Sequence, residues 1–211
     1  MMDVQLQQVK PEEIEAESFR IIEHELGPTG HGPAEFAVVR RVIHATGDFG
    51  FSENLRFHPE AISAGLAAIR AGKNILVDVT MVAAGISKGL LGKWGGAVLC
   101  KVGDPGVAAA AKQQGRTRSE VAIATMAQEN VGIVAIGNAP TALLQVMALI
   151  EQGLFMPDLV IGVPVGFVNA AESKAILAAK PYPFITAMGR KGGSPVAAAT
   201  VNALLRLAEE R

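Results

Sequence analysis

Residues 132–153 read GIVAIGNAPTALLQVMALIEQG and contain one complete unit of the fold. The run Gly132–Ile136 is short, apolar and rich in β-branched residues, as is typical of a buried strand. Pro140 is a favourable first residue for a helix, and Gly153 is a plausible end for it. The stretch therefore predicts a strand, a polar turn and a helix in succession.

The same unit recurs along the chain after Gly72. Five short β-rich runs are each followed by a helical segment: Ile75–Val79, Ala97–Val102, Gly132–Ile136, Leu159–Val163 and Phe184–Ala187. Thr117 and Glu120 form a capping box for one of these helices. Strands that alternate with helices predict a doubly wound α/β fold, with a five-stranded parallel sheet and helices on both faces.

The first 72 residues are expected to be helical. Three helices are predicted, each opened near a proline and ended by a glycine: Pro11 to Gly27, Pro33 to Gly47 and Pro59 to Gly72. The chain shows no internal repeat and no interdomain linker, so residues 1–211 are expected to form a single domain.

Composition narrows the classes of function. Half of the 211 residues are hydrophobic and only 18% are charged, which argues against disorder. The net charge of −1 gives no field that would attract nucleic acid. Cys100 is the only cysteine, residues 1–10 have no signal-peptide core, and no run approaches the ~20 apolar residues of a membrane span. We expect a cytoplasmic protein with neither nucleic acid nor membrane as a partner.

Doubly wound sheets bind ligands at the carboxyl ends of their strands. The loop Gly189–Ser194 lies there, and its glycines, the start of the next helix, Arg190 and Lys191 suit an anion. An ordinary tight turn with solvated basic residues is the alternative. The loops at the carboxyl ends of the strands form one rim of the predicted sheet. Asn138 and Thr141 lie on this rim, although Asn-Ala-Pro-Thr is also a good helix start.

Two further groups of residues have both a structural and a functional interpretation. Arg116 and Arg118 form either a solvated turn or a site for carboxylates, since guanidinium offers paired donors. His44, one helical turn after Arg40, is either a helix cap or a proton-transfer residue. The four histidines lack metal-ligand spacing, so no metal site is expected.

Some common motifs are missing. The segment Gly85–Lys93 superficially suggests a phosphate loop, but its spacing is wrong, and Trp94 stands where Ser or Thr would bind magnesium. No strand is followed by G-x-G-x-x-G, and no G-x-S-x-G elbow occurs.

Several blocks, in order along almost the whole chain, resemble the precorrin-8X methylmutase family, which includes the cobalt-precorrin-8 methylmutases. The blocks are Ser18–Glu23, Val39–Phe49, Asp78–Val82, Gly85–Ile86, Thr117–Ser119, Gly137–Leu143, Gly162–Asn169, Glu172–Lys174 and Gly189–Ser194. The resemblance implies a flavodoxin-like three-layer fold with strand order 2-1-3-4-5, and a homodimer. It also implies a methyl shift between adjacent ring carbons of a corrin precursor, with His44 transferring a proton.

The resemblance further implies that no added cofactor is needed, because the conjugated ring supplies the electronics and any cobalt arrives within the substrate. The substrate is a macrocycle edged by carboxylates, whose binding requires cations, N–H donors and apolar contact. The residues expected to contact it are Ser18, Arg40, Thr80, Gly85, Arg116, Arg118, Asn138, Thr141, Arg190, Lys191 and Ser194. The four cations at positions 116, 118, 190 and 191 are expected to approach one cleft, either from one chain or with two of them from the partner subunit.

Two other functions stay open at this point. A corrinoid or tetrapyrrole carrier would bind the product tightly without catalysis, and would have no use for a proton-transfer histidine. An α/β enzyme acting on phosphorylated metabolites would rest on the glycine loops alone, and phosphate competition would favour it.

Overall fold

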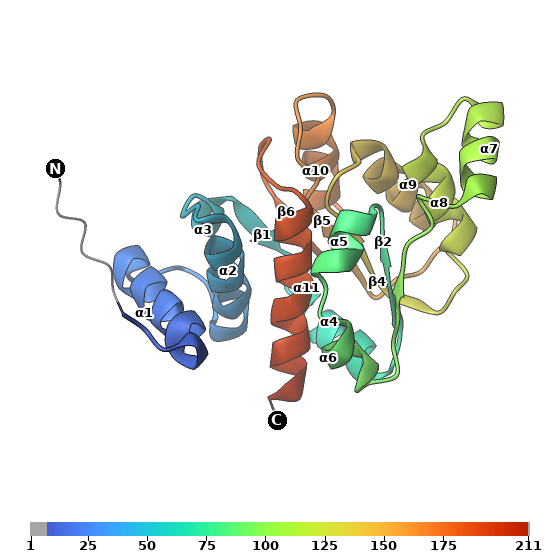
Figure 1. The fold of residues 1–211 in the computed structure, drawn as a ribbon. Coiled ribbons are helices and arrows are strands. Elements are labelled where there is room, and N and C mark those ends of the chain that lie inside the picture. The colour runs from blue at the N-terminus through green and yellow to red at the C-terminus, as the bar shows by residue number, and fades with distance from the viewer. Residues whose placement is uncertain (1–7, 211) are drawn as a thin grey trace, which may run out of the picture.

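The computed structural model describes residues 8–210 (Figure 1). The elements that precede the alternating part are η1 (Pro11–Glu13), α1 (Ile14–Leu26), α2 (Pro33–Thr46), α3 (Phe51–Asn54), β1 (Leu55–Phe57) and α4 (Ala61–Arg70). The alternating part comprises β2 (Asn74–Val77), α5 (Thr80–Gly85), α6 (Lys88–Gly92), β3 (Val98–Leu99), α7 (Pro105–Gln114), α8 (Arg118–Met126), β4 (Val131–Ile136), α9 (Pro140–Glu151), β5 (Leu159–Gly162), α10 (Ala170–Ala178), β6 (Phe184–Ala187) and α11 (Ser194–Glu209).

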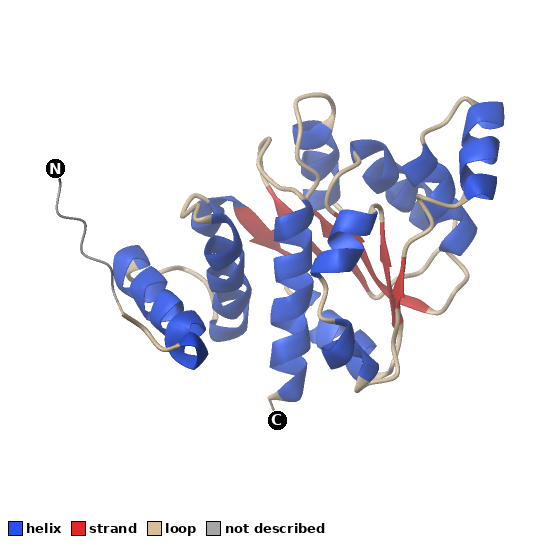
Figure 2. Ribbon diagram, in the orientation of Figure 1, coloured by secondary structure: helices blue, strands red, loops and turns tan. Residues whose placement is uncertain are grey.

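All the strands pair in one sheet, in the order β1-β6-β5-β4-β2-β3 (Figure 2). Neighbours among β6, β5, β4, β2 and β3 are parallel, so the five expected strands adopt the order 2-1-3-4-5. β1 pairs antiparallel with β6, with Leu55 opposite Ala187 and Phe57 opposite Ile185. The α/β fold is confirmed, but the expectation of a five-stranded parallel sheet is wrong, because β1 adds a sixth strand that makes the sheet mixed.

The prediction that the first 72 residues are helical is wrong in one respect, because this part of the chain also contains the strand β1. β1 contains three residues, too few for an alternating pattern to show, and its partner β6 lies more than a hundred positions later. By pairing with β6, β1 covers what would otherwise be an open edge of hydrogen-bonding groups.

Helices cover both faces of the sheet, because successive strand residues point to opposite sides. Ile75 and Val77 pack into the cluster formed with α2, α4, α5 and α11. Leu76 points the other way, into the cluster formed with α8, α9 and α10. α1 packs on α2 and lies at the outer end of the molecule (Figure 1). Within residues 8–210, every helix is too short or too polar to cross a bilayer.

Candidate active site

The loops that follow the parallel strands gather at one edge of the sheet, uppermost in Figure 1, where α11 begins. The loops after β5 and β6 are in direct backbone contact. The N–H of Gly193 donates to the carbonyl of Val163 at 2.8 Å, and a β-carbon on Gly192 would lie 2.3 Å from the same oxygen. Glycine at position 192 is therefore required for the loop after β6 to lie against the loop after β5.

Asp78 holds the loop after β4 in place. Its buried carboxylate follows β2 and accepts the backbone N–H groups of Gly137, Asn138 and Ala139 at 3.0, 2.8 and 2.7 Å. Burial raises the pKa of Asp78, and the three N–H donors oppose that shift. Asp78 is not among the residues predicted to form the site, and its signal in the sequence is a carboxylate directly after the buried run Ile75–Val77.

His44 and Ser18 form the most specific polar pair among the predicted site residues. Ser18 Oγ on α1 lies 2.8 Å from His44 Nδ1, in the last turn of α2. The imidazole also meets the ring of Phe19 edge-on, at 5.4 Å between centroids. These two contacts fix the orientation of the imidazole. Within the described residues, Nε2 has no hydrogen-bond partner, so that nitrogen is open to a ligand.

A hollow of about 170 Å³ lies beside this pair. It is lined by Ser18, Ile21, Ile22, Glu25, Ile43, His44, Gly47 and Phe49. The lining is largely apolar apart from Ser18, His44 and Glu25, which suits the edge of a conjugated ring beside one proton-transfer group.

Arg40 joins the two helices that carry the pair. Its guanidinium donates to the Glu23 carboxylate on α1 and lies 4.3 Å from the centroid of Phe19. Arg41 acts similarly, pairing with Glu15 at 2.7 Å. The structure thus gives Arg40 an intramolecular role in holding α1 against α2.

The end of α2 is linked to the loop after β6. Lys191 Nζ lies 2.7 Å from the Asp48 carboxylate, four residues after His44. This ion pair lowers the pKa of Asp48. The loop that carries Lys191 therefore lies next to the end of α2, where His44 is found.

Arg116, Arg118 and Thr141 form a second polar group on the other side of the sheet. Thr141 Oγ1 lies 2.9 Å from Thr117 Oγ1, and Thr117 completes the predicted capping box with Glu120. Arg116 donates to Gln145 and lies 3.7 Å from the Glu120 carboxylate. Arg118 is exposed at the start of α8, without an ion-pair partner in the described part of the chain.

The other predicted residues lie along the same rim. Thr80 is exposed at the start of α5, Asn138 is exposed after β4, and Ser194 is buried at the start of α11. Gly85 has a structural explanation, because a β-carbon there would come 2.7 Å from the β-carbon of Ala198. Its carbonyl accepts from Asn202.

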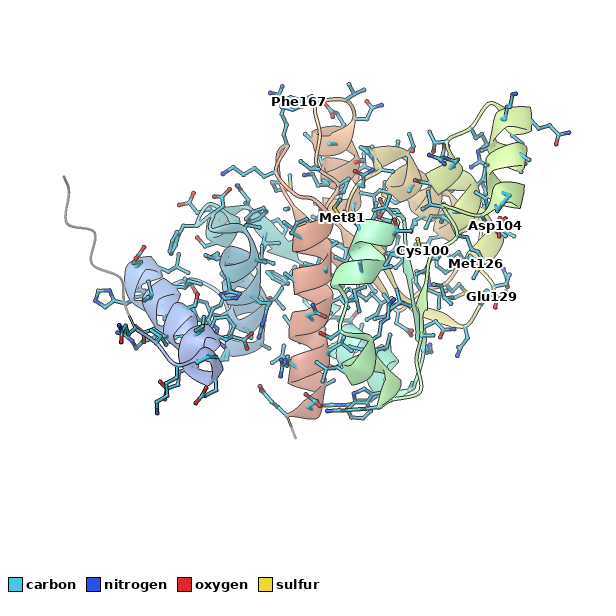
Figure 3. The ribbon with its side chains drawn as sticks, in the orientation of Figure 1. Met81, Cys100, Asp104, Met126, Glu129 and Phe167 are labelled. Carbon is cyan, nitrogen blue, oxygen red and sulfur yellow. The ribbon has the colours of Figure 1, made fainter. Side chains whose placement is uncertain are left out.

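Exposed apolar side chains accompany these polar groups. Phe167 is 83% exposed on the loop between β5 and α10, and Met81 is 68% exposed on α5 (Figure 3). The guanidinium of Arg190 lies 5.4 Å from the centroid of Phe167. The rim thus offers both apolar surface and positive charge.

The predicted cations lie with helices on opposite faces of the sheet. Arg190 and Lys191 lie on the loop after β6, and Lys191 contacts Asp48 just after α2, whereas Arg116 and Arg118 lie at the start of α8, which packs on the opposite face of the sheet. Within residues 8–210, no three His, Cys, Asp or Glu side chains meet as metal ligands.

Comparison with known proteins gives a consistent result. The family described as precorrin-8X methylmutase (CbiC) matches residues 13–207. A cobalt-precorrin-8 methylmutase of Priestia megaterium is 46% identical over 202 residues, covering 95% of this chain and 90% of that protein. A precorrin-8X methylmutase of Pseudomonas aeruginosa is 46% identical over 167 residues, covering 78% and 80%.

The fold agrees with a solved structure as well. The crystal structure of a precorrin-8X methylmutase from Thermus thermophilus superimposes with a TM-score of 0.87 and 46% identity. The match covers 93% of this chain and 96% of that one. The chain belongs to the precorrin-8X methylmutase family.

Proposed function

We propose that this chain moves a methyl group from the eleventh to the twelfth ring carbon of precorrin-8X or cobalt-precorrin-8, giving hydrogenobyrinate or cobyrinate in cobalamin biosynthesis. Family membership over residues 13–207 supports the class of reaction. The proposed role of His44 in this reaction rests on its contact with Ser18 through Nδ1. Within residues 8–210, this contact leaves Nε2 of the imidazole without a hydrogen-bond partner, beside an apolar hollow.

The methyl shift is a [1,5]-sigmatropic rearrangement. The migrating group keeps its bonding electrons within the conjugated ring system, so the product is an isomer and no nucleophile is consumed. His44 donates a proton to a ring nitrogen as the methyl migrates and takes it back afterwards, which leaves the proton balance unchanged. No added cofactor takes part in this proposal, and any cobalt belongs to the substrate.

Ser18 supports both protonation states of His44. A hydroxyl group both donates and accepts hydrogen bonds. In the acid form, the imidazolium, Nδ1–H donates to Ser18 Oγ and Nε2–H faces the ligand. Loss of the Nε2 proton leaves a neutral imidazole that keeps its proton on Nδ1, so Ser18 Oγ accepts from Nδ1–H in both states. The pair at 2.8 Å therefore accommodates both proton loss and proton gain at Nε2 without movement of either helix.

Substrate binding is assigned to the rim. Arg190, Lys191, Arg116 and Arg118 are proposed to meet peripheral carboxylates, with Phe167 and its apolar neighbours against the flat ring. The two pairs lie with helices on opposite faces of the sheet, and a homodimer whose subunits share the site would bring further cations to the His44 region.

Incubation of the purified protein with precorrin-8X and with cobalt-precorrin-8, followed by absorption spectroscopy, tests the proposal. We expect conversion of at least one substrate, because the shift changes ring conjugation and hence the spectrum. Tight binding of product without conversion of either substrate would instead support a corrinoid carrier. Competition by inorganic phosphate would support an enzyme of phosphorylated metabolites.

A further inference from the structure

Lys174 is a fully buried cation that the proposed reaction does not use. It lies on α10 and has no exposed surface. Its ammonium donates to the backbone carbonyl of Lys191 at 2.6 Å, in the loop after β6. Burial lowers the pKa of Lys174 to about 8, so the side chain is still largely charged at pH 7.

The surroundings of Lys174 provide no counter-charge. α10 packs against β6, which has no titratable side chain, and against α9, whose only one is Glu151 at the far end, paired with Lys180. Glu172 on α10 itself is exposed. The covering loop adds two further cations, Arg190 and Lys191, and within residues 8–210 Lys174 forms no ion pair.

The contact with Lys174 also determines how the loop presents its N–H groups. In a trans peptide, the carbonyl of one residue and the N–H of the next point in opposite directions. The carbonyl of Arg190 accepts from the N–H of Gly166 at 3.2 Å, and the carbonyl of Lys191 accepts from Lys174. The N–H groups of Lys191 and Gly192 therefore point away from these donors. Within residues 8–210 neither N–H group donates to a protein acceptor, so both are available to an anion.

We propose that Lys174 is a positioning residue for substrate binding, which turns the carbonyl of Lys191 inward so that the loop Gly189–Gly193 offers its N–H groups and positive charge to a substrate carboxylate. The inference rests on the proposed function. A side chain without an N–H group at position 174 would remove the donor that holds this carbonyl, and the oxygen would then be free to face the anion. Deprotonation of Lys174 would weaken the contact from a charge-assisted to a neutral hydrogen bond. The bound carboxylate in turn stabilises the uncompensated charge of Lys174.

The test is a titration of product binding with the purified full chain and cobyrinate, followed by absorbance. Lys174→Met keeps the length of the side chain and removes the charge. We expect its Kd at pH 7 to rise about 10-fold, as for the loss of one charge-assisted hydrogen bond. Its thermal midpoint should be unchanged or higher, because a buried, unpaired charge is removed. A merely structural role for Lys174 would lower the midpoint and leave Kd unchanged.

The pH profile is the second measurement. The product binds best when Lys174 is charged, so the wild-type Kd should rise as pH rises from 7 to 9 through the pKa of about 8. Lys174→Met should lose this dependence. Lys180→Met, a matched change at the surface pair with Glu151, should keep both the affinity and the profile of the wild type.

The outcomes separate this inference from the proposed function. A wild-type protein that binds neither cobyrinate nor hydrogenobyrinate contradicts the proposed function. A wild-type protein that binds it with a Kd that stays flat between pH 7 and 9, or a folded Lys174→Met variant with wild-type affinity, overturns the role of Lys174 alone. If Lys174→Met does not fold, the wild-type profile still decides.

Discussion

Replacement of Ser18 by alanine should slow the methyl shift without weakening binding of the ring. The change removes the contact of 2.8 Å between Ser18 Oγ and His44 Nδ1. One hydrogen bond of this kind contributes about 0.5–1.5 kcal/mol net. If it is made in the transition state, its loss lowers the rate about 2- to 13-fold, since 1.36 kcal/mol corresponds to tenfold. Water can replace the half-buried hydroxyl in part, so we expect a decrease of about 3- to 10-fold.

The assay is the single-turnover absorbance change with enzyme in excess, together with a separate titration of product. Ser18→Thr, which keeps the hydroxyl, should restore most of the rate. Ser63→Ala, on α4, removes a hydroxyl that donates to the carbonyl of Glu60; it is the control and should behave like the wild type. Wild-type turnover by Ser18→Ala would show that the contact does not orient His44, and the reasoning would fail.

Two further changes test the assignments on the rim. Gly85→Ala should lower the free energy of unfolding in urea by about 1–3 kcal/mol, because the new β-carbon would overlap Ala198. Gly89→Ala is its control, since the space around that position is open. A Gly85→Ala variant that is fully stable but no longer binds substrate would show that Gly85 belongs to the binding site. Arg116→Met should raise the Kd for product about 10-fold at low ionic strength, with a smaller effect at high salt, where exposed charges are screened. Lys112→Met is the matched control, and an unchanged Kd for Arg116→Met at low salt would remove Arg116 from the binding surface.

The sequence predicted those parts of the fold that local patterns determine. Proline and glycine mark the ends of α2 and α9, and the predicted capping box of Thr117 and Glu120 begins α8. β1 has no such local signal, because three residues become a strand only through pairing with β6. Its prediction needs the three-dimensional arrangement rather than the period of the sequence.

The candidate site shows the same division. The family resemblance points to Ser18 and His44, but their contact joins residues 26 positions apart on two packed helices, and no spacing rule predicts it. Asp78 and Lys174 appear in the sequence as ordinary charged residues, and only burial reveals that each holds a loop of the rim. Arg40 and Gly85 are the opposite case. Both were expected to contact the substrate, but contacts within the chain explain the residue at each position.

The rate of methyl migration in a His44→Ala variant tests the central claim most directly. Single-turnover absorbance should show a decrease of about 10²–10⁴-fold, the usual contribution of a proton-transfer residue, while product affinity and the unfolding transition stay close to those of the wild type. His24→Ala, on the exposed side of α1, should retain full activity. Near-normal migration by a folded His44→Ala protein would contradict the account and leave His44 as a helix-terminal residue without a catalytic role.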